Sequence, residues 1–391
     1  MLTGQNGILN RAAESKEKTE IANKDEQRKL AQAEALMNTE KTTYKGVTLP
    51  EGFAPTKISG EDSIDDGLVI TDGYGNEYVW VEVPTTIYDN TTYNNNGANK
   101  PSNSEDYTNI EACLKSYTKD YSDSNYSDTN SSFTTLYQNM LKSVYTNGGF
   151  WIGRYETGYE IDEGVGDKNR DYGTDYSTEY PITQKAVIKE NAYPYNWVRR
   201  NQAQTLANGM KYEGVTSSLM FGVQWDLVLK YIEEKTVAKA EESNKSTVRA
   251  DIQNKLASNS TPIGNYYNSK FTLNRGKFAQ NNVLSKWYNF NIEDKTDLVI
   301  GSQKKTQSSN ANAILLTTGA TEATRLQNIY DIAGNLWEWT LELSGTSDNC
   351  VCRGGSYLGD GSSRFAKHRY GGYGTGLSDN SIGFRVGLWN L

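Results

Sequence analysis

The sequence reads YDIAGNLWEWT at residues 330–340, RGGSY at residues 353–357 and SIGFRV at residues 381–386. These stretches combine glycines with large aromatic residues, which is typical of tight turns next to buried strands. Gly334, Gly354 and Gly355 suit turns or a close approach of two backbones. Trp337 and Trp339 are two residues apart, so on a strand they share one face. Because large aromatic side chains dominate core energetics, we expect both tryptophans to pack in the core.

Three segments earlier in the chain belong with these stretches. They read YVWVEV at residues 78–83, FWIGRYE at residues 150–156 and SLMFGVQWD at residues 218–226. Together, and in this order, the six pieces resemble the formylglycine-generating enzyme family, a branch of the C-type lectin fold. The resemblance covers about residues 68–388 and implies an α+β fold of the C-type lectin (formylglycine-generating enzyme-like) type, with large insertions and a preceding N-terminal α-helix.

The first 40 residues differ from the rest of the chain. Residues 10–37 contain no glycine or proline and are rich in alanine, glutamate and lysine, which favour a helix. The preceding LTGQNGILN, residues 2–10, resembles the segment just after the membrane helix of Gram-positive type IV pilin-like proteins. In that family an apolar N-terminal helix anchors the protein or packs into a fibre. Because that helix is missing here, we expect Met1 to be an artificial start and the chain to be a soluble truncation of an exported protein.

The resemblances divide the chain into three parts. Residues 1–40 would form a pilin-like helical stalk, residues 41–60 a linker, and residues 61–391 the C-type lectin-like ligand-binding domain. Within that domain, polar stretches at about residues 85–147 and 235–310 predict insertions, the first of them a surface insertion or long loop.

Local patterns predict three further elements. Two β-rich runs around a Gly/Asn/Asp turn predict a hairpin at residues 68–83. The stop signal at Gly209 predicts a helix at residues 196–208, and apolar residues at helical spacing predict another at residues 221–234.

The composition excludes several classes of function. Lys and Arg total 40 against 48 Asp and Glu, and the net charge of -8 argues against a nucleic-acid binder, which needs a basic patch. Zinc hydrolase sites and histidine-ligated iron sites draw on several histidines, but the only histidine is His368. No run approaches the roughly 20 apolar residues of a membrane helix.

The cysteines argue against the chemistry of the resembling enzymes. Formylglycine-generating enzymes oxidise a substrate cysteine with copper held by two thiols just after the Gly-Gly-Ser-Tyr segment, whereas residues 358–363 here read LGDGSS. Cys350 and Cys352 precede that segment, and thiolate chemistry depends on placement. They alternate on an expected strand, at the outer limit for a disulfide, so we expect two free thiols. Cys113 makes the number of cysteines odd, so at least one thiol has no intramolecular cysteine partner. Because no cysteine follows the Gly-Gly-Ser-Tyr segment, where the resembling enzymes hold copper, we expect no enzymatic activity.

A second group with the same fold gives a better match to the C-terminus. The variable proteins of diversity-generating retroelements keep a stable scaffold while side chains near the C-terminus are rewritten to bind different ligands. This chain resembles that layout, because RGGS and IGFRV flank a varied polar and aromatic stretch. Tyrosine and arginine give large contacts, while serine, glycine and asparagine adapt hydrogen bonds. The predicted ligand-binding residues are Tyr357, Leu358, Asp360, Arg364, His368, Tyr370, Tyr373, Ser378, Asp379 and Asn380.

Asn335 and Glu338 are spaced for a turn-bound cation, as in some relatives, so we name them as a candidate structural calcium site. No other cofactor is expected.

As a whole, the sequence predicts a bacterial cell-surface protein that binds ligands without catalysis, like a receptor or adhesin. It would be extracellular, anchored to a membrane or pilus through the missing helix, and would bind an unknown protein or glycan but no nucleic acid. Two alternatives stay open: a formylglycine-generating-type cysteine oxidase, and a structural minor pilin with a lectin-like head.

Overall fold

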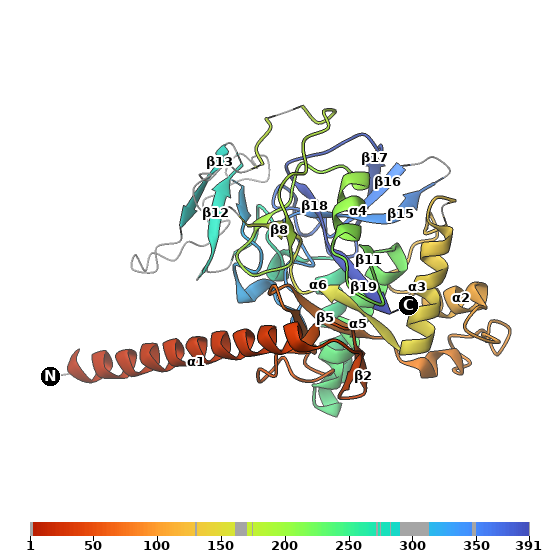
Figure 1. The fold of residues 1–391 in the computed structure, drawn as a ribbon, viewed down its shortest axis with the longest axis horizontal. Helices are drawn as coiled ribbons and strands as arrows, with labels where there is room; N and C mark the ends of the chain where they lie inside the picture. The colour runs from red at the N-terminus through yellow and green to blue at the C-terminus, as the bar shows by residue number, and fades with distance from the viewer. Residues whose placement is uncertain are drawn as a thin grey trace.

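The computed structural model describes residues 3–129, 131–160, 170–173, 175–270, 273, 275–281, 283–289, 313–345 and 349–390. These residues form a mixed α and β fold with several small sheets and a few helices (Figure 1). The helices are α1 (Thr3–Met37), α2 (Tyr107–Tyr117), α3 (Thr134–Asn147), α4 (Arg200–Gly209), α5 (Gly222–Ala238) and α6 (Lys245–Ala257). Short 3-10 helices are η1 (Thr85–Tyr88), η2 (Glu242–Asn244), η3 (Thr261–Ile263) and η4 (Glu322–Thr324).

The largest sheet is antiparallel throughout. Its strand order is β11 (Val215–Leu219), β19 (Val386–Asn390), β7 (Gly149–Gly153), β5 (Glu77–Glu82), β4 (Val69–Asp72) and β3 (Phe53–Pro55). Helix α3 packs against β7 and β19, and α5 packs against β5. Strand β7 is therefore buried along its whole length and β5 along nearly all of it.

A second sheet carries most of the C-terminal residues. Its order is β17 (Arg369–Tyr373), β16 (Asn349–Arg353), β15 (Trp337–Ser344) and β18 (Ile382–Phe384), and β6 (Tyr126–Ser127) also pairs with β15. Strand β18 runs parallel to β15, and the other pairs are antiparallel. Two connections, residues 354–368 and 374–381, leave this sheet and return to it, and they contain most of the predicted ligand-binding residues.

Three smaller sheets complete the described strands. They are β10 (Tyr193–Pro194) with β8 (Gly158–Tyr159) and β9 (Ala186–Val187); β13 (Val283–Asn289) with β12 (Lys277–Gln280) and β14 (Ile314–Leu316); and β1 (Thr42–Tyr44) with β2 (Val47–Leu49).

The structure corrects two expectations about polar stretches. Residues 85–147 are not a long loop, because α2 and α3 lie within them and bury Leu114 and Met140 in the main core. Their apolar residues recur at helical spacing but are hidden among many polar ones. Residues 41–60 contain β1, β2 and β3, and Phe53 is fully buried, so this stretch belongs to the folded body and is not a free linker. Of the second polar stretch, residues 290–310 lie outside the described residues.

Helix α1 projects from the body along most of its length (Figure 1). Residues 15–27 are exposed, whereas Ala31 and Ala35 are buried where the last turns pack against β3 and β4. Arg28 is the anchor: it donates to Glu77 at 2.9 Å and to Glu61 at 3.0 Å. Buried Arg154 donates to the same two carboxylates at 2.9 and 2.8 Å. None of the helices in the described residues combines the length and apolar character that a membrane crossing needs.

We expect Arg28→Ala to loosen the docked end of α1 without unfolding the body. Glu61 and Glu77 keep Arg154 as a partner, so the loss should be only about 1–2 kcal/mol of unfolding free energy, below the cost of leaving a buried charge with no partner at all. Hydrogen exchange should show faster exchange in residues 28–37 and little change in β5 or β7. Lys24→Ala, a change on the exposed part of α1, is the matched control. Equal exchange in both variants would contradict this role of Arg28.

Candidate ligand-binding face

An aromatic cluster lies across three strands of the second sheet. In register, Trp339 on β15 lies opposite Cys352 on β16, which lies opposite Tyr370 on β17. The Trp339 ring is 5.9 Å from that of Tyr373, and Tyr370 and Tyr373 are 5.0 Å apart. Trp337 contacts Tyr370 at 5.9 Å. The two tryptophans are buried and the two tyrosines half-buried, so the tyrosine rings lie nearer the surface and pack on buried tryptophan rings.

His368 and Arg364 extend this cluster at the start of β17. The His368 ring lies 5.7 Å from Trp337, and its Nε2 is 3.2 Å from Arg364 Nη1. The Arg364 guanidinium is 5.9 Å from the Tyr370 ring. Burial first, and then the charges of Arg364, Arg353 and Arg369, lower the pKa of His368 from 6.5 to about 4. The histidine is therefore neutral at physiological pH and presents a flat, uncharged ring.

We expect the single histidine to titrate near pH 4 in the folded chain. A folded pKa below the unfolded one means that His368 contributes stability above pH 6.5, and that this contribution is lost as the pH falls through about 4. Since there is one histidine, its ring proton signals in an NMR titration report this pKa directly. The chain unfolded in urea should titrate near 6.5. A folded pKa of 6 or above would show that the ring is not held between tryptophan and arginine. His368→Gln should remove this part of the acid sensitivity.

A second group of predicted residues gathers around the connection from β17 to β18. Tyr357 is fully buried, and its hydroxyl donates to Asn281 Oδ1 at 3.0 Å. Asn380 Nδ2 donates to the same oxygen at 3.5 Å. Asp379 is half-buried, and its Oδ1 accepts hydrogen bonds from Ser381. Ser378 is buried, and its Oγ has no hydrogen-bond partner among the described residues.

Leu358 and Asp360 have contacts of a different kind. Leu358 packs against the main core. Asp360 Oδ1 accepts from Ser362 N and Oγ at 2.8 and 2.7 Å and from Asn268 at 2.9 Å. These bonds hold the turn at residues 360–363 and lower the pKa of Asp360, although burial opposes them. The structure thus gives Asp360 a role in shaping the connection.

On the opposite face of the same strands, two buried arginines share two buried carboxylates. Arg353 donates to Asp226 at 2.7 Å and to Glu342 at 3.1 Å. Arg369 donates to the same carboxylates at 2.6 and 2.7 Å. Asp226 lies on α5, so the network joins that helix to β15, β16 and β17. The arrangement fixes the strands that carry the aromatic cluster.

A second buried ion pair involves a predicted calcium residue. Both carboxylate oxygens of Glu338 accept hydrogen bonds from Arg385, at 2.6–3.1 Å. Asn335 Oδ1 accepts from Asn265 at 2.9 Å and from Leu316 N at 3.0 Å. The oxygens proposed to bind calcium therefore have protein donors as partners, and these contacts do not favour the calcium prediction. No group of three or more His, Cys, Asp or Glu residues in the described part of the chain could hold a metal ion.

No protein-family model matches the sequence, and no curated protein matches it. Among solved structures, the chain is similar to Treponema denticola variable protein 1, with 12% sequence identity and a TM-score of 0.30. The match covers 62% of this chain and 85% of that chain. So distant a likeness assigns neither a fold nor a function.

Tyr176 is a residue of this face that the sequence does not single out. It is 42% exposed, and its ring stacks on buried Trp197 with centroids 5.6 Å apart and planes 19° apart. Its carbonyl accepts from Ser378 N at 3.0 Å, which places it beside the C-terminal connection. Tyr176 stands in a polar, acid-rich stretch far from the C-terminus, and no local pattern indicates this pairing.

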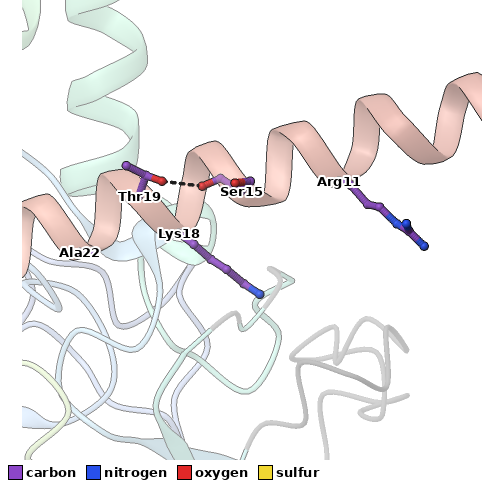
Figure 2. Close-up of a pocket in the computed structure, with 5 residues that line it drawn as sticks. All are labelled: Arg11, Ser15, Lys18, Thr19 and Ala22. Atoms are coloured by element: carbon purple, nitrogen blue, oxygen red, sulfur yellow. Dashed lines mark hydrogen bonds between the residues drawn. The ribbon is translucent and has the colours of Figure 1, made fainter.

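Two hollows lie elsewhere on the surface. One of about 330 Å³ is lined by the β4–β5 turn, residues 184–186 and the end of α4. The other is a recess along the exposed part of α1, where Arg11 and Lys18 extend from one side of the helix and Thr19 Oγ1 donates to Ser15 O at 2.9 Å (Figure 2). Neither hollow contains a predicted ligand-binding residue.

Proposed function

We propose that this chain is a ligand-binding protein with a C-type lectin-like fold, and that its C-terminal face binds the ligand without catalysis. One observation carries the proposal. Half-exposed tyrosine, histidine and arginine side chains stand on buried tryptophans, and the strands below them are held by buried ion pairs. Rigid aromatic and arginine side chains give large contacts at a low entropic cost, which suits a binding surface.

We further propose that this face is diversified between copies of the gene. The two flanking landmarks, residues 353–356 and 382–386, are buried throughout, which is what a constant scaffold requires. Between them, Arg364, His368, Tyr370 and Tyr373 are half-buried and contact one another mainly through rings. Replacing such residues changes a surface more than it changes a core.

The burial of the thiols supports a non-catalytic role. Cys350 and Cys352 are fully buried and form no disulfide, and burial, followed by the charge of Asp379, raises the pKa of Cys352 well above its usual range. Reactive cysteines have lowered pKa values and contact solvent or substrate. The resemblance of the N-terminal segment to pilin-like proteins supports our proposal of an extracellular, membrane- or pilus-attached location, with a protein or glycan as ligand.

Deep sequencing of the DNA for residues 335–391 across many cells and isolates tests this function. We expect substitutions to concentrate at Arg364, His368, Tyr370, Tyr373 and Asp379. The landmarks at residues 353–356 and 382–386 should stay constant, since changes there disturb buried groups. If the whole stretch is invariant while neighbouring silent sites vary, diversification is refuted and a fixed ligand becomes the working hypothesis.

Copper binding separates this proposal from the oxidase alternative. Reduced protein should bind copper(I) no more tightly than the Cys350→Ser, Cys352→Ser double variant, and neither form should consume oxygen with thiol substrates. Thiol-dependent oxygen uptake that the double variant loses would favour the enzyme.

A further inference from the structure

Asp379 differs from the carboxylates of the buried ion-pair networks near the C-terminal face. Glu338, Asp226 and Glu342 each pair with arginine. Asp379 has no ion pair in the described part of the chain, and both of its side-chain hydrogen bonds, from Ser381 N at 2.7 Å and Ser381 Oγ at 2.6 Å, end on Oδ1. Within the same residues, Oδ2 accepts no hydrogen bond and is not sealed from solvent. One carboxylate oxygen is thus available to a ligand.

Arg170, which donates to the carbonyl of Trp197 beside the segment that carries Asp379, is engaged by other partners. Arg170 donates to the carbonyl oxygens of Asn196, Pro181 and Trp197 and to Gln184, at 2.6–2.9 Å. It therefore stabilises the backbone around Trp197 and is not the counter-ion of Asp379.

Two tyrosines lie next to the segment that carries Asp379: the Tyr176 carbonyl accepts from Ser378 N at 3.0 Å, and Tyr373 ends β17, immediately before the connection at residues 374–381. Asp379 O accepts from Trp197 N at 3.0 Å, and Trp197 is the ring on which Tyr176 stacks. The next residue, Asn380, shares Asn281 Oδ1 with the hydroxyl of Tyr357. After burial, the Asp379 charge is the next cause that raises the pKa of Tyr176, Tyr357 and Tyr373. Of these rings, Tyr176 is exposed and Tyr373 half-buried, whereas Tyr357 is fully buried.

We propose that Asp379, with Tyr176 and Tyr373 as walls, binds an arginine or lysine side chain of a protein ligand. The inference rests on the proposed function and names the chemistry of its ligand. A half-buried carboxylate without a counter-ion has lost solvation that a ligand cation would replace. Tyrosine faces attract cations through their quadrupole. The net charge of -8 also favours a basic partner.

Tyr176 has a particular part in this site. It lies outside the C-terminal stretch that the proposed diversification would rewrite, so it supplies a constant wall beside changing residues. Tyr176 would keep one aromatic wall constant where diversification replaces Tyr373 or Asp379, and the preference for basic side chains would belong to the copies that carry Asp379.

The experiment uses the full chain and two small probes. Nα-acetyl-L-arginine N-methylamide carries the cation, and Nα-acetyl-L-citrulline N-methylamide is its neutral counterpart of the same shape. We expect the arginine probe to shift amide NMR signals around residues 176, 373 and 379 and the citrulline probe to do so at least about tenfold more weakly, since charged hydrogen bonds are worth this much or more.

Variants locate the binding. Asp379→Asn keeps the acceptor for Ser381 and should weaken arginine binding about 10- to 100-fold. Tyr176→Ala should weaken it about 2- to 5-fold. Asp251→Asn removes an exposed aspartate on α6 and should change nothing. Because burial raises the pKa of Asp379, its charge opposes folding at neutral pH, so Asp379→Asn should melt at the same or a higher temperature.

The outcomes are distinct. Equal binding of the two probes, no binding of either, or unchanged binding by folded Asp379→Asn overturns the inference. If that variant does not fold, the comparison of the probes on the original chain still decides. The proposed function is judged separately by sequencing, so a diversified face without arginine binding would refute only the cation site.

Discussion

Arg385→Met should cost about 3–5 kcal/mol of unfolding free energy, because it leaves buried Glu338 without its cation. Arg385 is 1% exposed and donates to Glu338, to Gly153 O at 3.0 Å and to Tyr330 O at 2.8 Å. Its charge also lowers the pKa values of Glu156 and Asp331, which burial raises. One guanidinium thus compensates three buried carboxyl groups.

Urea denaturation followed by tryptophan fluorescence measures this loss. The double variant Arg385→Met, Glu338→Leu should recover much of the stability, since removing both partners of a buried pair leaves no isolated charge. Arg385→Lys keeps the charge but cannot reach Glu338 and two carbonyls in one plane, so it should fall between. A loss below about 1 kcal/mol for Arg385→Met would show that water reaches Glu338.

Arg353→Met should have the second-largest effect, again about 3–5 kcal/mol, because Asp226 and Glu342 would then share Arg369 alone. Arg353 is fully buried, and its guanidinium also lies 5.5 Å from the Trp225 ring. The loss should be accompanied by weaker order in β17, since Arg369 begins that strand. Thermal or urea unfolding gives the free energy, and hydrogen exchange at residues 369–373 gives the local effect.

Arg364→Met is the matched comparison for this second prediction. Arg364 is half-buried and forms no ion pair within the described residues, so the same substitution should cost less than about 1 kcal/mol. Similar losses of unfolding free energy for the two variants would contradict our inference that Arg353 supports the fold and that Arg364 can be replaced at little cost.

Much of the local structure could be predicted from the sequence. The helix at the N-terminus, the hairpin at residues 68–83 and helices near 196–208 and 221–234 all occur, with boundaries a few residues away, because caps and periodicity are local. The helices inside residues 85–147 were missed, because polar residues mask their apolar spacing. Their burial depends on the rest of the core, which no short window contains.

The candidate site was predictable only in part. Arg364, His368, Tyr370 and Tyr373 do come together, since they are near one another in the chain and precede or lie on one strand. The burial of Tyr357 and Ser378 was not predicted. Tyr176 could not be found either, because its partner is about 200 residues away and the contact is made through a backbone carbonyl.

The projecting part of α1 sets a distance with an electrostatic consequence. Residues 3–27 of a straight helix span roughly 37 Å, at about 1.5 Å per residue. The Debye length is about 8 Å at physiological ionic strength. The electrostatic potential of charges near the far end of the helix therefore decays over several Debye lengths before it reaches the body. In Figure 1, the free end of α1 and strands β15, β16 and β17 lie at opposite sides of the view. Charges at the far end of α1 are therefore largely screened from the strands of the second sheet.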